Sequence, residues 1–95
     1  MTVEYESYPT VWHALFDDPV ERLNLRMRAD LMIAVKRQIK AWGLTQKDAA
    51  KRLGLTQPRV NLLLKGKINE FSLDALIKIA VAAGIEVHLD LKEAA

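Results

Sequence analysis

Apolar residues recur at spacings of three and four through most of residues 19–84, which is the period of an amphipathic α-helix. Four glycines interrupt this pattern, and each follows a stretch with the helical period. Glycine readily adopts the left-handed conformation that ends a helix, so we interpret each one as a helix stop. They are Gly43, Gly54, Gly66 and Gly84. The pattern therefore predicts four helices.

The first predicted helix runs from about Pro19 to Trp42 along a stripe of apolar residues. The stripe consists of Leu23, Met27, Leu31, Val35, Ile39 and Trp42. Asp30 could begin a second segment, but the unbroken stripe favours one helix. Each shorter helix follows a residue with an N-capping hydroxyl. We expect Thr45 before a helix ending at Leu53, Thr56 before one ending at Lys65, and Ser72 before one ending at Gly84.

The period changes after Gly84. Apolar Ile85, Val87, Leu89 and Leu91 alternate with polar residues, which predicts a half-buried β-strand over residues 85–92. Val3–Tyr5 is the best partner within the chain, and it is short. We therefore favour pairing with the same strand of a second subunit over an internal hairpin. The expected fold class is mainly α, a bundle of about four helices with a C-terminal β-strand.

Composition indicates one domain with a packed core, because 51% of the 95 residues are hydrophobic. The absence of cysteine excludes disulfides and thiolate sites. No apolar run is long enough to span a bilayer, and residues 1–6 lack the basic start and apolar stretch of a signal peptide. We expect a soluble, cytoplasmic protein with no membrane contact.

The net charge of +2 conceals two opposed blocks. From Arg22 to Lys67 there are twelve Lys and Arg residues but only two carboxylates, Asp30 and Asp48. The rest of the chain is acidic. Such a concentration of positive charge favours a polyanionic partner. The alternative is a solvated helical surface, since Lys and Arg are good helix formers.

Residues 46–65, QKDAAKRLGLTQPRVNLLLK, have the pattern of two helices that cross at a tight turn. Ala50 is small where the second helix crosses, and Gly54 supplies a positive φ at the turn. The apolar positions predicted to face the core are Ala49, Leu53, Leu55, Val60 and Leu63. The polar residues left outward on the second helix are Gln57, Arg59, Asn61 and Lys65.

This segment resembles the Xre/Cro group of lambda-repressor-like helix-turn-helix proteins. The resemblance is carried by Leu53–Gln57, Val60 and the pair Lys65-Gly66, and it covers roughly residues 31–85. Gln57–Val60, residues 66–68 and the C-terminal strand are more narrowly similar to compact HigA-type antitoxins. Such proteins bind a small RNA-cleaving toxin and repress the promoter they share with it. Leu64 departs from the pattern, because many Xre members carry a glutamate there.

The resemblance implies a sequence-specific, DNA-binding transcriptional regulator that binds a palindromic operator in double-stranded DNA as a homodimer. Its expected base contacts are Gln57, Pro58, Arg59, Asn61 and Leu62. Its expected phosphate contacts are Thr45, Gln46, Lys47, Thr56, Lys65 and Lys67. A HigBA-type antitoxin with a small RNase toxin as partner is one expectation. A stand-alone repressor without a toxin, or a protein-interaction module, are the alternatives.

Residues 1–18 are expected to form an aromatic-rich arm ahead of a helix-turn-helix domain over residues 19–95. The aromatic residues of the arm are Tyr5, Tyr8, Trp12 and Phe16. They either cover the helical core, which we favour, or dock on a protein partner. His13 and His88 have no third ligand at metal spacing, and no serine has a nucleophile's context. We therefore expect no enzyme activity, no metal and no cofactor.

Overall fold

The computed structural model describes residues 18–94. The aromatic residues of the predicted N-terminal arm, and the Val3–Tyr5 segment predicted as a possible strand partner, lie outside the described residues.

Five helical elements follow one another along the described chain. They are α3 (Pro19–Trp42), α4 (Gln46–Leu53), α5 (Gln57–Leu64), the 3₁₀-helix η1 (Ile68–Glu70) and α6 (Leu73–Ala82). The four α-helices confirm the four predicted from the glycine stops. Helix α3 is continuous, so Asp30 does not begin a second segment. The short η1 was not predicted.

Each α-helix begins at a side chain that accepts a backbone N–H, as capping requires. The Asp18 carboxylate accepts the N–H of Val20 at 2.9 Å, and Pro19 occupies the first turn of α3, where a missing N–H costs nothing. The other helices are capped by the hydroxyls of Thr45, Thr56 and Ser72. Each hydroxyl accepts a hydrogen bond from the backbone N–H of the residue three positions later, at 3.1–3.3 Å. The three predicted caps are confirmed.

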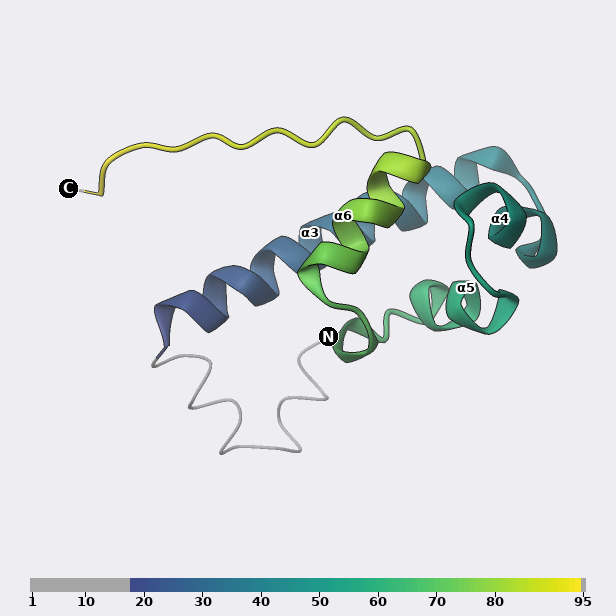
Figure 1. The fold of residues 1–95 in the computed structure, drawn as a ribbon, viewed down its shortest axis with the longest axis horizontal. Helices are drawn as coiled ribbons and strands as arrows, with labels where there is room; N and C mark the ends of the chain where they lie inside the picture. The colour runs from purple at the N-terminus through teal and green to yellow at the C-terminus, as the bar shows by residue number, and fades with distance from the viewer. Residues whose placement is uncertain (1–17, 95) are drawn as a thin grey trace.

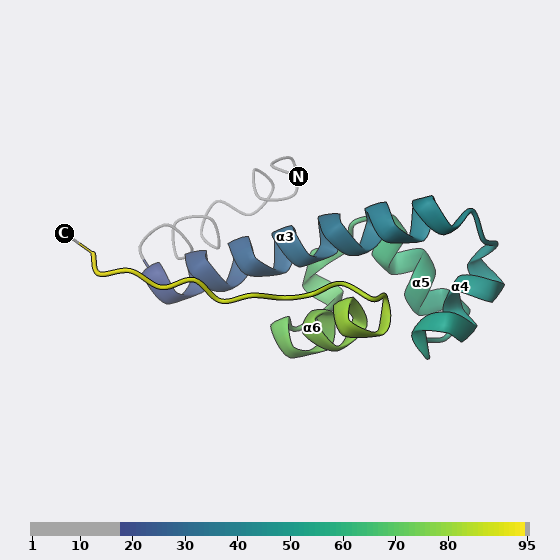
Figure 2. The same ribbon diagram turned by 90° about the horizontal axis from the view of Figure 1, so that it is seen from above.

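The helices pack around the C-terminal part of α3 (Figures 1 and 2). Helix α6 packs against α3, and α4 packs against α5 at the far end. The N-terminal part of α3 projects beyond the bundle (Figure 2). Leu23, in this projecting part, is 59% exposed although it belongs to the predicted apolar stripe. The stripe therefore faces the core only where another described helix covers it.

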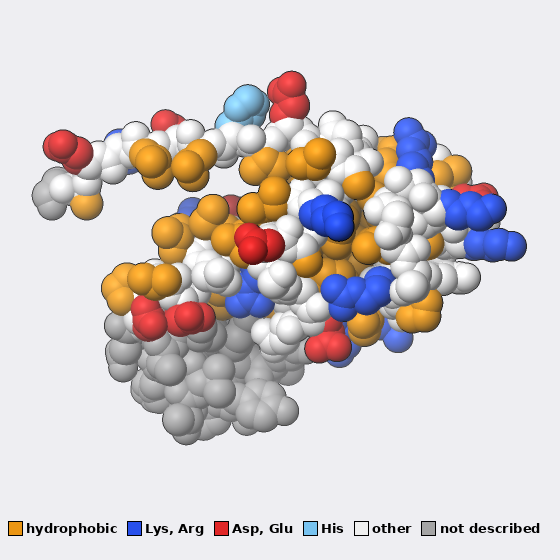
Figure 3. All heavy atoms as spheres, viewed as in Figure 1, with side chains coloured by type: hydrophobic (Ala, Val, Ile, Leu, Met, Phe, Trp, Pro, Cys, Tyr) orange, Lys and Arg blue, Asp and Glu red, His pale blue; other side chains and the backbone are white. Residues whose placement is uncertain are grey.

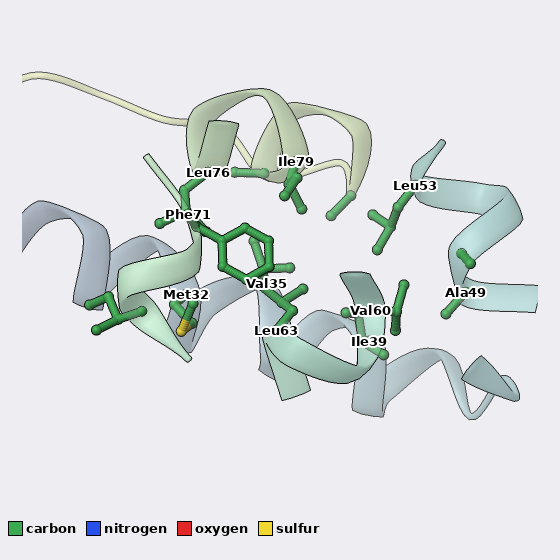
Figure 4. Close-up of a cluster of buried hydrophobic side chains, with 14 residues drawn as sticks. Met32, Val35, Ile39, Ala49, Leu53, Val60, Leu63, Phe71, Leu76 and Ile79 are labelled. Carbon is green, nitrogen blue, oxygen red and sulfur yellow. The ribbon is translucent and has the colours of Figure 1, made fainter. Parts of the chain in front are cut away.

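The core is a single apolar cluster shared by all the helices (Figure 4). Val60 and Leu63 of α5 and Val35 of α3 are completely buried. The prediction for residues 46–65 is confirmed, because four of the five inward residues are buried and Leu55 packs against the cluster. Phe71, directly after η1, is 1% exposed and closes the cluster between α5 and α6. No helix within residues 18–94 is both long and apolar enough to cross a membrane.

The predicted β-strand over residues 85–92 is not seen among the described residues, and its pairing with a second subunit stays a prediction. Residues 85–94 leave α6 as an extended segment, and none of the described residues forms a β-ladder with them (Figure 1). A strand requires a neighbour for its N–H and C=O groups, and the helical bundle offers none. Among the backbone bonds of the described residues, the N–H of Ile85 alone joins this segment to the bundle, by a bond to the Ala80 carbonyl at 3.0 Å.

Leu63 provides a test of the core. Leu63→Ala is expected to lower the free energy of unfolding by about 2–5 kcal/mol, because it leaves a cavity in the apolar cluster that the helices share. Urea unfolding followed by circular dichroism measures the change. Val81→Ala is the matched control, because Val81 is 63% exposed and its truncation should change stability by less than about 0.5 kcal/mol. Equal losses in the two variants would contradict this description of the core.

Candidate nucleic-acid interface

The angle between α4 and α5 is set at Gly54. Gly54 has a φ of 69°, which side-chain-bearing residues rarely adopt, and its N–H bonds to the Lys51 carbonyl at 3.3 Å. The N–H of Leu55 then returns to the Ala50 carbonyl at 2.9 Å. These two bonds satisfy the last carbonyls of α4 and redirect the chain within three residues. Buried Ala49 and Ala50 allow close approach where the helices meet.

Helix α5 divides into an inner and an outer face. Successive residues of an α-helix are separated by about 100° around the axis. With Val60 and Leu63 completely buried, this spacing places the opposite face outward. We call that surface the outer face of α5, and it consists of Gln57, Pro58, Asn61, Leu62 and Lys65.

The outer face offers both polar and apolar groups. Gln57 and Pro58 are exposed, and Asn61 and Leu62 are half-buried. No described residue forms a hydrogen bond with the side-chain amide of Gln57 or of Asn61, so both retain a donor and an acceptor for another molecule. The two amides lie one helical turn apart.

Arg59 lies at the edge of this face, not at its centre. Its guanidinium donates a hydrogen bond to the Glu70 carbonyl at 2.9 Å and covers the Phe71 ring at 4.1 Å from the centroid. Arg59 thus connects α5 to η1. Of the five residues predicted to contact bases, Arg59 is the one whose polar group is already bonded within the protein.

The residues predicted to contact phosphate surround the outer face on two sides. Thr45 and Lys47 lie at the start of α4, and both are exposed, while Gln46 between them is half-buried. Thr56, Lys65 and Lys67 lie before and after α5 and are exposed. The hydroxyls of Thr45 and Thr56 accept their capping bonds and still have an O–H to donate.

The charge separation seen in the sequence is also present in space. Lys and Arg side chains gather at the end of the molecule that carries α4 and α5, while most of the visible acidic side chains lie along the C-terminal segment and toward the N-terminal part of α3 (Figure 3). Such a dipolar surface favours one orientation toward a polyanion.

A family profile described as a helix-turn-helix domain matches residues 15–92. The chain belongs to this helix-turn-helix family. The match covers α4, the Gly54 turn and α5, together with the helices on either side of them. No curated protein gives a significant match to the chain.

Two further arginines of this helix-turn-helix protein support the fold, and sequence reasoning assigned them no role. Arg28 donates to the Asn24 side chain at 2.7 Å and to the Ile68 carbonyl at 3.2 Å, so α3 also holds η1. Arg52 of α4 lies over the Trp42 ring at 4.2 Å from the centroid. The contacts of Arg28 with Ile68 and of Arg52 with Trp42 depend on tertiary packing, so no local pattern in the sequence indicates them. Part of the basic block is therefore structural.

The contacts of Arg59 lead to a stability prediction. Arg59→Ala is expected to lower the free energy of unfolding by about 1 kcal/mol, through loss of the cation–π contact and of the bond to the Glu70 carbonyl. Thermal or urea unfolding measures it. Arg37→Ala, which removes the same charge from an exposed position of α3, serves as control and should leave stability nearly unchanged. Identical behaviour of the two variants would show that the Arg59 contacts contribute nothing.

Proposed function

We propose that the protein is a sequence-specific, DNA-binding transcriptional regulator of the cytoplasm, acting as a homodimer. The observation that carries the proposal is the outer face of α5, a short helix bordered by lysines on which the Gln57 and Asn61 amides have no hydrogen-bond partner among residues 18–94. An α-helix of this kind fits the major groove of B-DNA, whose base edges present both donors and acceptors.

Each outer-face residue has a chemical role in this proposal. The Gln57 amide can accept from and donate to an adenine edge, and Asn61 can do the same one turn further on. Pro58 and Leu62 offer apolar contact to a thymine methyl group. The Arg59 guanidinium uses one of its five N–H donors on the Glu70 carbonyl and lies over the Phe71 ring, so we assign it first to positioning α5, with its remaining donors facing a guanine or a phosphate as a second role.

The surrounding residues supply the contacts that do not depend on sequence. Lys47 and the hydroxyl of Thr45 flank the start of α4, where backbone N–H groups also suit a phosphate. Thr56, Lys65 and Lys67 border α5 on its other sides. With Gln46, these residues form the proposed phosphate-contact set.

A homodimer would present two copies of α5 to one face of the duplex. Two such helices enter successive major grooves when they are about 34 Å apart, which corresponds to half-sites about ten base pairs apart. The operator we propose is therefore a palindrome with that spacing.

The similarity of Gln57–Val60 and residues 66–68 to HigA-type antitoxins supports a narrower proposal, in which the regulator also neutralises a small RNase toxin. Co-expression with the product of an adjacent small gene, followed by purification on a tag carried by that product, tests it. A stable complex supports the antitoxin role. Failure to associate with any adjacent gene product leaves a stand-alone repressor.

A helix-turn-helix domain used only for protein contacts is the remaining alternative. Fluorescence anisotropy with a random-sequence duplex at low and moderate salt separates it from a DNA-binding protein. Binding that weakens steeply with salt supports DNA binding, because phosphate contacts release condensed counterions. No binding at low salt would overturn the proposal.

The assignment of α5 to base recognition predicts the behaviour of Gln57→Ala. This variant should lose about 1–3 kcal/mol of discrimination at one base pair, with little change in binding to random duplex. Selection of bound duplexes from a randomised pool measures the change. An unaltered base preference would show that α5 is not the reading helix.

Lys47 leads to the opposite prediction. Lys47→Ala should weaken binding to all sequences alike and reduce the slope of log K against log salt by about one, because one phosphate contact is lost. Anisotropy titrations at several salt concentrations provide the slope. Lys78→Ala, an exposed lysine on α6, is the control and should leave the slope unchanged. A sequence-dependent loss in Lys47→Ala would contradict its assignment to the backbone.

A further inference from the structure

The extended segment 85–94 has two chemically different sides. Val87, Leu89 and Leu91 are 46%, 73% and 79% exposed, although all three are large and apolar. Glu86 and His88 alternate with them and contact each other at 3.4 Å, as residues two apart do on one side of an extended chain. Figure 3 shows the segment's hydrophobic side chains mostly on the side toward the helices, with acidic and histidine side chains on its outer edge.

A second exposed apolar surface lies on the projecting part of α3. Val20 is 72% exposed and Leu23 is 59% exposed. In both ribbon views the C-terminal segment runs back in the direction of this part of α3 (Figures 1 and 2). Within residues 18–94 two apolar surfaces are therefore left exposed. One of them lies on a segment whose backbone groups have no ladder partner among these residues.

We propose that residues 86–92 pair antiparallel with the same residues of a second copy of this chain, with Leu89 on the two-fold axis. In this register Leu89 faces Leu89, and Val87 faces Leu91 of the partner subunit. Six apolar side chains then gather on one side of a two-stranded sheet. The projecting α3 helices supply the apolar cover that two isolated strands need.

The charges on the other side of the segment select this register. With Leu89 at the centre, Glu86 lies opposite Lys92 of the partner subunit, and His88 lies opposite Asp90 of the partner subunit. By symmetry each pairing occurs twice. Directly opposed residues of unlike charge stabilise an antiparallel pair, and like charges destabilise it.

The neighbouring registers that keep apolar residues opposite apolar residues are less favourable. Centring the pair on His88 places Glu86 opposite Asp90, and centring it on Asp90 places the two Asp90 carboxylates opposite each other. Centring it on Val87 avoids like charges but brings the partner's helix end at Ala83 opposite Leu91. A parallel, in-register pair opposes every charge to its own copy. Only the Leu89-centred register sets each acidic side chain of residues 86–92 against a basic one.

This inference refines the homodimer of the proposed function, but its test needs no DNA. Sedimentation equilibrium of the full chain measures the dimer dissociation constant. Lys92→Glu should raise that constant about tenfold, since it places two carboxylates opposite each other twice per dimer. Glu86→Lys should do the same, because it opposes two ammonium groups. The double variant Glu86→Lys/Lys92→Glu should restore dissociation to near the wild-type value.

Lys78→Glu makes the same charge change on α6 and should leave the constant unchanged. Circular dichroism of each variant checks that the helices are intact, which is expected because residues 86–92 lie outside the core. A monomeric wild-type chain overturns the inference, as does a dimer whose dissociation responds equally to Lys92→Glu and Lys78→Glu or is not rescued by the double variant. Salt-dependent duplex binding by a monomeric chain would leave the proposed DNA binding standing while this inference fails.

Discussion

The arrangement of the candidate interface depends on the burial of one side of α5. This helix has only eight residues, too few to be stable in water by itself, so its orientation is fixed by what it packs against. Val60 and Leu63 are completely buried against α3 and Phe71, and Arg59 ties the helix edge to η1. Once these contacts are made, helical geometry leaves Gln57 and Asn61 outside.

Helices were predictable from sequence because their signals are local. The capping hydroxyls, the positive-φ glycines and the apolar period all act within a few residues, and all four helices formed as these signals indicated. The η1 helix has three residues, too few to show a period. The C-terminal strand is not seen for another reason, because alternation describes a side-chain pattern, whereas a strand also needs a backbone partner that residues 18–94 do not supply.

In the candidate site, too, the features that depend on local spacing were predictable and those that depend on tertiary packing were not. Spacing alone separated the inner and outer residues of α5, since exposure follows from position around the helix axis. It could not show that the Arg59 guanidinium bonds to a carbonyl eleven residues further on, or that Arg28 reaches across from α3 to Ile68. Both contacts depend on tertiary packing. A basic residue's role in such a domain is therefore decided by its neighbours in space.

The length of α3 has a mechanical consequence. Its 24 residues form a continuous rod about 36 Å long, with the α4–α5 unit at one end and, at the other, an apolar surface that no described helix covers. A tilt of about 5° imposed on the uncovered end would move the opposite end by about 3 Å, close to the rise of one base pair, about 3.4 Å. In the dimer proposed above, the way this end of α3 packs on the paired strands would therefore set the spacing of the two α5 helices without contact to either one.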